Sequence, residues 1–210
     1  MSLKKLSWII LLVIIHDQAL KIFIKLNYPI TFFGMEPIID WGWFKLLFIE
    51  NKGMAWGARL DDFFPFISEN SAKLILSLFR IVAAFLIGFW LIKTFNKATV
   101  LYSIGLALIF AGAVGNIIDS LFYGLIFSDS YGRIAEFLPI EGGYAPFMFG
   151  HVVDMFQFPM FSWVWPNWTP FVGGQSFTFF EPVFNIADSA ISIGFVFILF
   201  AGTKKSSELY

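Results

Sequence analysis

The stretch Pro182–Ala201, PVFNIADSAISIGFVFILFA, decides the fold of this chain. It is apolar over about 20 residues, which is the length that an α-helix needs to cross a bilayer. Asp188 lies near its start, although a carboxylate costs roughly 2.5–3.5 kcal/mol at the centre of a membrane-spanning helix. A chain that carries such a residue usually has a use for it, so Asp188 is the first candidate functional residue.

The composition extends this reading to the whole chain. Of 210 residues, 58% are hydrophobic and 14% are charged, whereas soluble domains are about 45–50% apolar and 25% charged. Further apolar runs lie at about 6–26, 72–92 and 99–121. With 182–201 they predict an all-α polytopic membrane protein with four transmembrane helices. We treat residues 1–210 as a single membrane domain.

Several functional classes are excluded or disfavoured by residue counts. The net charge of −1 argues against a basic nucleic-acid-binding face. The absence of cysteine excludes disulfides and a cysteine nucleophile. His16 and His151 are the only histidines, which disfavours a zinc site. We therefore expect neither a metal nor a cofactor.

The first apolar run has two interpretations. Lys4 and Lys5 followed by Ile9–Ile15 resemble the start of a cleavable signal peptide. However, no small-x-small cleavage site follows, and polar His16-Asp17-Gln18 leads into further apolar residues. We therefore expect a retained first span.

The segments between the runs, about 27–70 and 122–180, are expected to lie outside the membrane. Phe44–Ile49 predicts a strand followed by a turn at Asn51-Lys52-Gly53. Residues 27–70 are expected to form a small sheet and a short surface helix. Residues 122–180, rich in Gly, Pro and aromatic residues, are expected to form a long loop at the bilayer interface.

Lysines predict the orientation of the spans. Pairs at 4–5, 93 and 97, and 204–205 fall on the same side of a four-span protein. The positive-inside rule makes that side cytoplasmic. Both termini are then cytoplasmic. Asp17, Asp119 and Asp188 fall in the outer half of the bilayer, level with Asp154 in the outer loop.

Two further polar groups lie within the spans, and each has a structural alternative. Asp17 and Lys21 are four residues apart and can form an ion pair within one helix that has no chemical role. Gly112, Asn116 and Asp119 share one helix stripe. Packing explains the glycine, but it does not explain the two polar residues together.

The pairing of Asp154 with Asp188 predicts a chemistry. Two aspartates in a low-dielectric site share one proton, because both cannot ionise cheaply. Such a pair can hydrolyse a peptide bond, with one carboxylate activating water and the other donating a proton. Asn185, three residues before Asp188, is placed to support the pair.

Five short motifs occur in order along the chain. They are Asp17-Gln18 with Lys21, Asn51-x-Gly53-x-Ala55-Trp56-Gly57, Gly112-x-x-Gly115-Asn116-x-x-Asp119, Val152-Val153-Asp154, and Phe184-Asn185-x-Ala187-Asp188. Together they resemble the lipoprotein signal peptidase (signal peptidase II) family of bacterial membrane aspartyl proteases. A chance match to one motif is easy, whereas five in order are specific.

The resemblance implies an enzyme of the bacterial inner membrane that cleaves diacylglyceryl-modified prolipoproteins before the lipid-modified cysteine. It implies membrane lipids as partners and inhibition by a cyclic peptide of the globomycin type. It also implies a mobile surface helix over the site. By motif position, Asp154 and Asp188 are the catalytic residues. The supporting residues are Asp17, Lys21, Asn51, Gly53, Gly112, Asn116, Asp119, Asn185 and Ala187.

The chain departs from the family pattern at two places. Ser120 stands where the family usually has arginine, and we expect Arg80 to balance the charge of Asp119 instead. The segments between Asp119 and Asp154 and from 156 to 180 are longer than the family's links. We expect them to add an outer wall or lid that contacts lipid or substrate.

Two rival functions remain open from the sequence. A small proton- or ion-coupled transporter also needs intramembrane acids, but it requires polar groups across the midplane rather than toward one face. A non-enzymatic assembly factor would use Asp and Asn only for helix packing, so Asp→Asn variants at 154 and 188 would stay functional.

Overall fold

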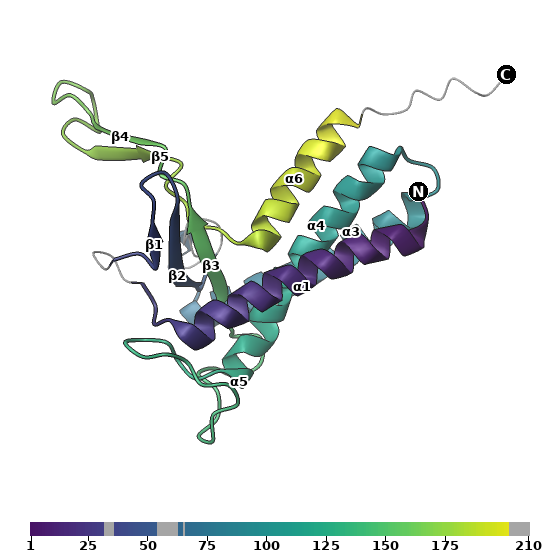
Figure 1. The fold of residues 1–210 in the computed structure, drawn as a ribbon, viewed down its shortest axis with the longest axis horizontal. Coiled ribbons are helices and arrows are strands. Elements are labelled where there is room, and N and C mark those ends of the chain that lie inside the picture. Colours follow the sequence, from purple (N-terminus) through teal and green to yellow (C-terminus); the bar gives the residue numbers. More distant parts are fainter. Residues whose placement is uncertain (32–35, 54–62, 65, 202–210) are drawn as a thin grey trace.

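The computed structural model describes residues 1–31, 36–53, 63–64 and 66–201. Four long helices run side by side, with a small sheet at one end of them (Figure 1). They are α1 (Leu3–Asn27), α3 (Glu69–Thr94), α4 (Val100–Ile118) and α6 (Ile186–Phe200). The start of α1, the α3–α4 connection and the end of α6 all lie at the end opposite the sheet (Figure 1).

Helix α4 is central, because α1, α3 and α6 all pack against it. Its contact with α6 is very close: a Cβ added at Gly112 would lie 2.2 Å from the Ala187 carbonyl oxygen. One added at Gly105 would lie 2.7 Å from the Gly194 carbonyl oxygen. Small residues two turns apart on both helices therefore let the backbones touch. This contact fixes the height of the start of α6 against α4.

The helical run of α4 continues past the predicted end at residue 121. A π-helical turn, η2 (Asp119–Tyr123), leads into α5 (Gly124–Ile126). Such turns are rare and occur frequently at functional sites. Asp119, Ser120 and Tyr123 in this turn are all buried, so polar groups end up inside the protein at the end of the span.

Strands β1 (Ile39–Asp40), β2 (Lys45–Asn51) and β3 (Val152–Gln157) form an antiparallel sheet in that order. The predicted strand at 44–49 is confirmed. The expectation that 122–180 is a loop carrying Asp154 is wrong, because β3 carries it. Residues 152–155 are all buried, so they lack the alternation that marks a half-exposed strand.

A second sheet consists of the hairpin β4 (Phe161–Val164) and β5 (Ser176–Phe179). It projects away from the helices beyond the first sheet (Figure 1). Aromatic rings stack along it, with the Phe161 and Phe179 centroids 4.9 Å apart. Residues 155–180 contain no ionisable side chain, a composition that suits the membrane interface.

Two described helical runs are long and apolar enough to cross a membrane, Glu69–Thr94 and Val100–Ile126. Helix α6 is apolar but shorter, at 15 residues. The outward face of α3 carries exposed large apolar side chains, among them Phe79, Phe85 and Phe89, as expected where lipid replaces water. The four predicted spans are thus supported in part. The surface helix expected within residues 27–70 is not tested, because residues 32–35, 54–62 and 65 lie outside the described part of the chain.

Candidate active site

Strand pairing brings the two candidate catalytic residues together. Asp154 lies on β3, whose one edge pairs with β2. At the other edge, Phe156 and Phe184 exchange backbone hydrogen bonds of 2.8 and 2.9 Å. Phe184 directly precedes Asn185, the N-cap of α6, so this pairing places the first turn of the helix beside Asp154.

Asp188 is held at the N-terminus of α6 by a capping box. The Asn185 side chain accepts a 2.9 Å hydrogen bond from the Asp188 backbone N–H, and the Asp188 carboxylate accepts one from the Asn185 N–H at 3.3 Å. Acidic side chains are favoured at this position because the helix dipole is positive there. The Asp188 carboxylate therefore has a fixed place in the first turn.

Asp154 is only 4% exposed and has two amide donors. Asn185 Nδ2 donates to Oδ1 at 2.7 Å and Asn51 Nδ2 donates to Oδ2 at 3.1 Å. Burial, and next the charge of Asp188, raise the pKa of the Asp154 carboxyl to about 7, against the restraint of these hydrogen bonds. Near neutral pH, Asp154 can therefore carry a proton.

Asn116 and Asn185 connect the aspartates to each other and to a cation. Asn116 Nδ2 donates to Asp188 Oδ1 at 2.8 Å, while its Oδ1 accepts from Lys21 Nζ at 2.9 Å. Asn185 Nδ2 also donates to Asn116 Oδ1 at 3.2 Å. With Asp154, these residues form one continuous polar network.

Lys21 pairs with two buried carboxylates. Its ammonium lies 2.8 Å from Asp17 and 2.7 Å from Asp119, and all three side chains are fully buried. The expected Asp17–Lys21 pair is confirmed. The expectation that Arg80 balances the charge of Asp119 is wrong, because Lys21 forms the ion pair with Asp119. Arg80 instead donates to the Ser120 hydroxyl at 2.8 Å and to the Gly53 carbonyl at 3.0 Å.

The two acids of this cluster also hold the backbone around the candidate catalytic residues. Asp17 accepts from the Ala187 N–H at 2.9 Å. Asp119 accepts from the Val153 N–H at 3.3 Å. Each therefore fixes the residue just before one of the two aspartates. This makes the Asp17–Lys21 pair more than an isolated link within one helix.

Glycines complete the set of predicted positions. Gly53 N donates to Asn51 Oδ1 at 2.9 Å, which turns the Asn51 amide so that its nitrogen faces Asp154. Gly112 leaves room for the Ala187 carbonyl. The structure thus places all the predicted site residues in one connected group around Asp154 and Asp188.

A cleft of about 1290 Å³ opens in front of both aspartates. Its walls come from α3 through Arg80, from α4 through Asn116, and from α6 through Asp188 to Ile193. Residues 177–184, at the base of the hairpin, close another side. Because apolar surface predominates in its lining, the cleft suits a substrate with long apolar parts and a polar reacting group.

Three residues near the site were not among the predicted positions. Gln18 Nε2 donates to Asp119 at 2.8 Å and to the Gly115 carbonyl at 3.1 Å. The Tyr123 hydroxyl donates to Gln18 Oε1 at 3.1 Å. The Ser120 hydroxyl accepts a hydrogen bond from Arg80 and donates one to the Asn116 carbonyl at 2.9 Å. Gln18, a polar residue one helix turn from Lys21, was readable from the sequence, whereas Tyr123 needed the π-helical turn.

Comparison with known proteins identifies the family of the chain. The model of the signal peptidase II family matches residues 9–204. A lipoprotein signal peptidase of Porphyromonas gingivalis is 44% identical over 198 residues, which cover 93% of this chain and 81% of that protein. One of Amoebophilus asiaticus is 33% identical over 93% of this chain and 76% of its own length.

Solved structures agree on the fold. A bacterial membrane enzyme solved by the in meso method superposes with a TM-score of 0.61 at 24% identity, covering 99% of this chain and 96% of the other. A second such structure gives a TM-score of 0.58 at 22% identity, covering 97% and 96% of the two chains. The family match spans nearly the whole chain, so this protein belongs to the signal peptidase II family of aspartic-type membrane proteases.

Proposed function

We propose that this chain removes signal peptides from diacylglyceryl-modified prolipoproteins, cutting just before the lipid-modified cysteine, with Asp154 and Asp188 as the catalytic pair. The observation that carries the proposal is that both carboxylates line one cleft and share Asn185 as a hydrogen-bonding neighbour. The membership of the family supports the substrate class.

The proposed mechanism begins with Asp154 protonated and Asp188 ionised, because the pKa of Asp154 is raised to about 7. Asp188 takes a proton from a water molecule while the water oxygen attacks the scissile carbonyl carbon. At the same time Asp154 gives its proton to the carbonyl oxygen. The resulting diol returns a proton to Asp154. Asp188 then protonates the amide nitrogen, the C–N bond breaks, and both carboxylates regain their starting states.

The buried residues around the two carboxylates hold them in position during this reaction. The amides of Asn51, Asn116 and Asn185 each donate to a catalytic carboxylate. They keep the two groups apart and oriented while the proton moves. The Lys21 ammonium lies one amide away from Asp188, so it steadies the negative charge that stays on the pair throughout.

The shape of the cleft suggests how a lipid-modified substrate enters. Helices α3 and α6 each pack on α4, and the cleft lies between them. We propose that the signal helix and diacylglyceryl chains approach sideways through this gap, from the bilayer. A cyclic peptide inhibitor of the globomycin type would occupy the same space.

The proposed orientation has four spans with both termini cytoplasmic and the cleft at the outer face. Two findings support it. The sheet lies at the opposite end of the helices from the start of α1 and the α3–α4 connection (Figure 1). Lysines at 4, 5, 93 and 97 belong to that other end, which the positive-inside rule assigns to the cytoplasm.

The proposal is tested by incubating purified protein with a diacylated lipobox peptide and with its unlipidated twin. The lipidated peptide should be cut before its cysteine, and the twin should be cut poorly. Asp154→Asn and Asp188→Asn should each lower kcat/KM by about 10²–10⁴-fold, because each removes one proton-transfer step.

The matched control is Asp129→Asn, since Asp129 is exposed and pairs with Arg133 outside the cleft. It should cleave at the wild-type rate. If either amide variant at 154 or 188 cleaved as well as the control while remaining folded, the aspartates would serve packing, and the proposed chemistry would be wrong.

A further inference from the structure

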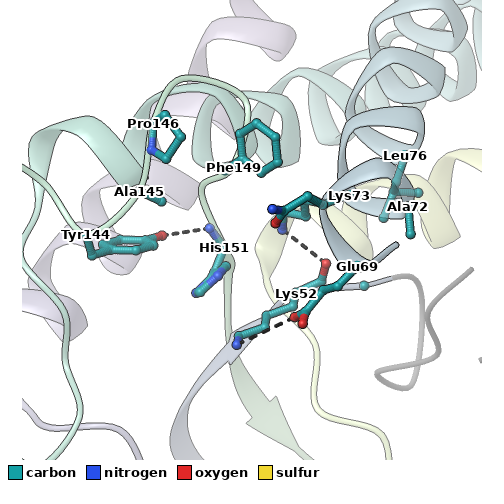
Figure 2. A pocket seen from close by; sticks show the side chains of 12 residues that line it. Lys52, Glu69, Ala72, Lys73, Leu76, Tyr144, Ala145, Pro146, Phe149 and His151 are labelled. Carbon is teal, nitrogen blue, oxygen red and sulfur yellow. Dashed lines mark hydrogen bonds and ion pairs between the residues drawn. The ribbon is translucent and has the colours of Figure 1, made fainter. Parts of the chain in front are cut away.

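A second cavity, of about 420 Å³, lies at the sheet end of α3. Figure 2 shows its walls: the first two turns of α3, the residues after β2, and the loop that leads to β3. Its polar lining residues are Lys52, Glu69, Asn70, Lys73, Tyr144 and His151. Neither Asp154 nor Asp188 lines it, although Lys52 lines both this cavity and the cleft.

Lys73 is the unusual residue of this cavity. It is only 8% exposed, and its ammonium donates to the Lys52 carbonyl at 3.1 Å (Figure 2). Within the described part of the chain, no carboxylate lies within ion-pair distance of it. An ammonium has three protons to donate, and one carbonyl does not neutralise its charge. A buried charge without a counterion is costly, so binding of an anion would stabilise the Lys73 ammonium.

The neighbouring groups do not supply that anion. The Glu69 carboxylate lies 3.9 Å from Lys52 Nζ, and both side chains are about half exposed, which makes a weak pair at the rim. Glu50 is engaged elsewhere, by Lys25 and by His151 at 3.0 Å. The Tyr144 hydroxyl accepts from the His151 N–H at 2.7 Å, which leaves its own proton for a further acceptor.

We propose that this cavity binds the phosphate of a membrane phospholipid headgroup, with the Lys73 ammonium as its main contact and Lys52 and the Tyr144 hydroxyl as additional donors. A phosphate offers several acceptor oxygens and the negative charge that Lys73 lacks. The cavity volume is sufficient for a headgroup and is too small for a folded partner.

A lipid is favoured over free phosphate by what lies beside the cavity. Helix α3 is long and apolar enough to span a membrane. Leu74, Ile75 and Leu78, in the turns next to Lys73, are exposed. Acyl chains can lie along this face while the headgroup enters the cavity, because the sheet end of α3 is where the headgroup layer meets a spanning helix.

The cavity is linked to the candidate active site by the backbone carbonyls of Lys52 and Gly53, which follow Asn51 in the chain. Lys73 holds the Lys52 carbonyl and Arg80, two turns on, holds that of Gly53. Asn51, directly before them, donates to Asp154. A bound headgroup would therefore steady the segment that orients Asn51.

The test measures the melting temperature of delipidated, detergent-solubilised full-length protein. The additives are short-chain phosphatidylglycerol, the matching diacylglycerol, and inorganic phosphate. Phosphatidylglycerol should raise the melting temperature of the wild-type protein. Diacylglycerol and millimolar phosphate should raise it far less, because each lacks one half of the ligand.

Lys73→Met should lose most of the phosphatidylglycerol effect and require at least about 10-fold more lipid for a given shift, the change that 1.4 kcal/mol produces. The apolar replacement removes a buried charge, so the variant should fold. Lys93→Met is the matched control: it removes an exposed lysine from the other end of the same helix and should respond like wild type.

Three outcomes would overturn the proposal. The first is an equal response of Lys73→Met and wild type to phosphatidylglycerol. The second is an equal response of the wild-type protein to phosphatidylglycerol and diacylglycerol, which needs no variant. The third is a response to inorganic phosphate as large as that to the lipid, which would mean a general anion site. None of these results bears on whether Asp154 and Asp188 cleave prolipoproteins.

Discussion

Asp154 combines two opposing influences on its carboxyl group. Its near-complete burial and the nearby Asp188 favour the protonated form, whereas the amide donors of Asn51 and Asn185 favour the ionised form. Burial prevails and its pKa is raised to about 7. A carboxyl group that gains and loses a proton near neutral pH is suited to general acid catalysis.

The first prediction at this scale concerns the pH dependence of cleavage. Above about pH 7 Asp154 loses its proton, both carboxylates are charged, and the general acid is missing, so kcat/KM should fall. On the acid side, uptake of a second proton by the coupled pair removes the base, so kcat/KM should fall again. Steady-state rates between pH 4 and 9 should give a bell whose two apparent pKa values belong to the pair.

The control for this profile is substrate binding measured over the same range with an inactive variant such as Asp188→Asn. Binding should vary much less than the rate. A rate that stays constant from pH 5 to pH 9 would show that no shared proton takes part in the reaction.

A second residue-scale prediction concerns Arg80. It holds the Gly53 carbonyl and the Ser120 hydroxyl at the wall of the cleft. Arg80→Ala should lower kcat/KM by roughly 10–100-fold, since a hydrogen bond to a charged group is worth about 1.5–3 kcal/mol. Ser120→Ala should have a much smaller effect, because it leaves the Arg80–Gly53 contact in place.

Arg80→Lys keeps the charge and should recover part of the activity in the same cleavage assay. A purely structural role for Arg80 would lower the melting temperature without changing kcat/KM of the remaining folded enzyme. Equal losses in Arg80→Ala and Ser120→Ala would contradict the assignment.

At the scale of elements, the contact between α4 and α6 sets the position of the first turn of α6, which carries Asp188. Gly105 and Gly112 on α4 face Gly194 and Ala187 on α6 at backbone contact distance. A Cβ atom added at these glycines would clash with backbone atoms of the facing helix. The backbone cannot rotate away from such a clash as a side chain can. Asp188 follows Ala187 directly, so a shift of this contact would move the carboxylate that we propose to be catalytic.

Gly112→Ala should therefore reduce both stability and activity. Its Cβ would meet the Ala187 carbonyl oxygen at 2.2 Å, and overpacking of this kind costs about 1–3 kcal/mol. The melting temperature in detergent should fall by several degrees. Gly88→Ala is the control, because its Cβ would meet only the Phe110 ring, at 2.8 Å, which can turn aside. Equal melting temperatures for the two variants would refute the argument.

At the scale of the whole molecule, the sheet lies at one end of the helices (Figure 1). The site acids meet where β3 and the start of α6 come together, since Asp119 accepts from Val153 N–H and Asp17 accepts from Ala187 N–H. This arrangement differs from that of a transporter, which needs polar groups across the midplane. An enzyme that acts on lipid-modified protein at a membrane face needs its cleft at that face, open to the bilayer at the side.

The proposed orientation can be mapped with introduced cysteines, because the chain has none of its own. Glu141 lies in an exposed loop at the sheet end, and Lys97 lies in the α3–α4 connection. A membrane-impermeant maleimide should label Glu141→Cys in intact spheroplasts and should label Lys97→Cys only after lysis. The reverse pattern would place the cleft in the cytoplasm and exclude the proposed substrate route.

The sequence by itself determined the membrane character, the apolar runs and the identity of the polar residues within them. This follows because an apolar run of bilayer length, and a charge inside it, are local properties of the chain. The motif order likewise indicated the family and marked Asp154 and Asp188 as the candidate catalytic pair. The strand at 44–49 was also readable, since its flanking turn residues are local signals.

Only the tertiary structure decided that Asp154 lies on a strand between β2 and Phe184, and that Lys21 rather than Arg80 neutralises Asp119. Both facts depend on pairings between residues far apart in sequence, such as the 2.7 Å contact of Lys21 with Asp119. A local pattern does not contain the register of such pairings, because register is set by which faces can be buried together. The buried position of Lys73, without an ion-pair partner among the described residues, likewise depends on tertiary structure, since its environment comes from three separate segments of the chain.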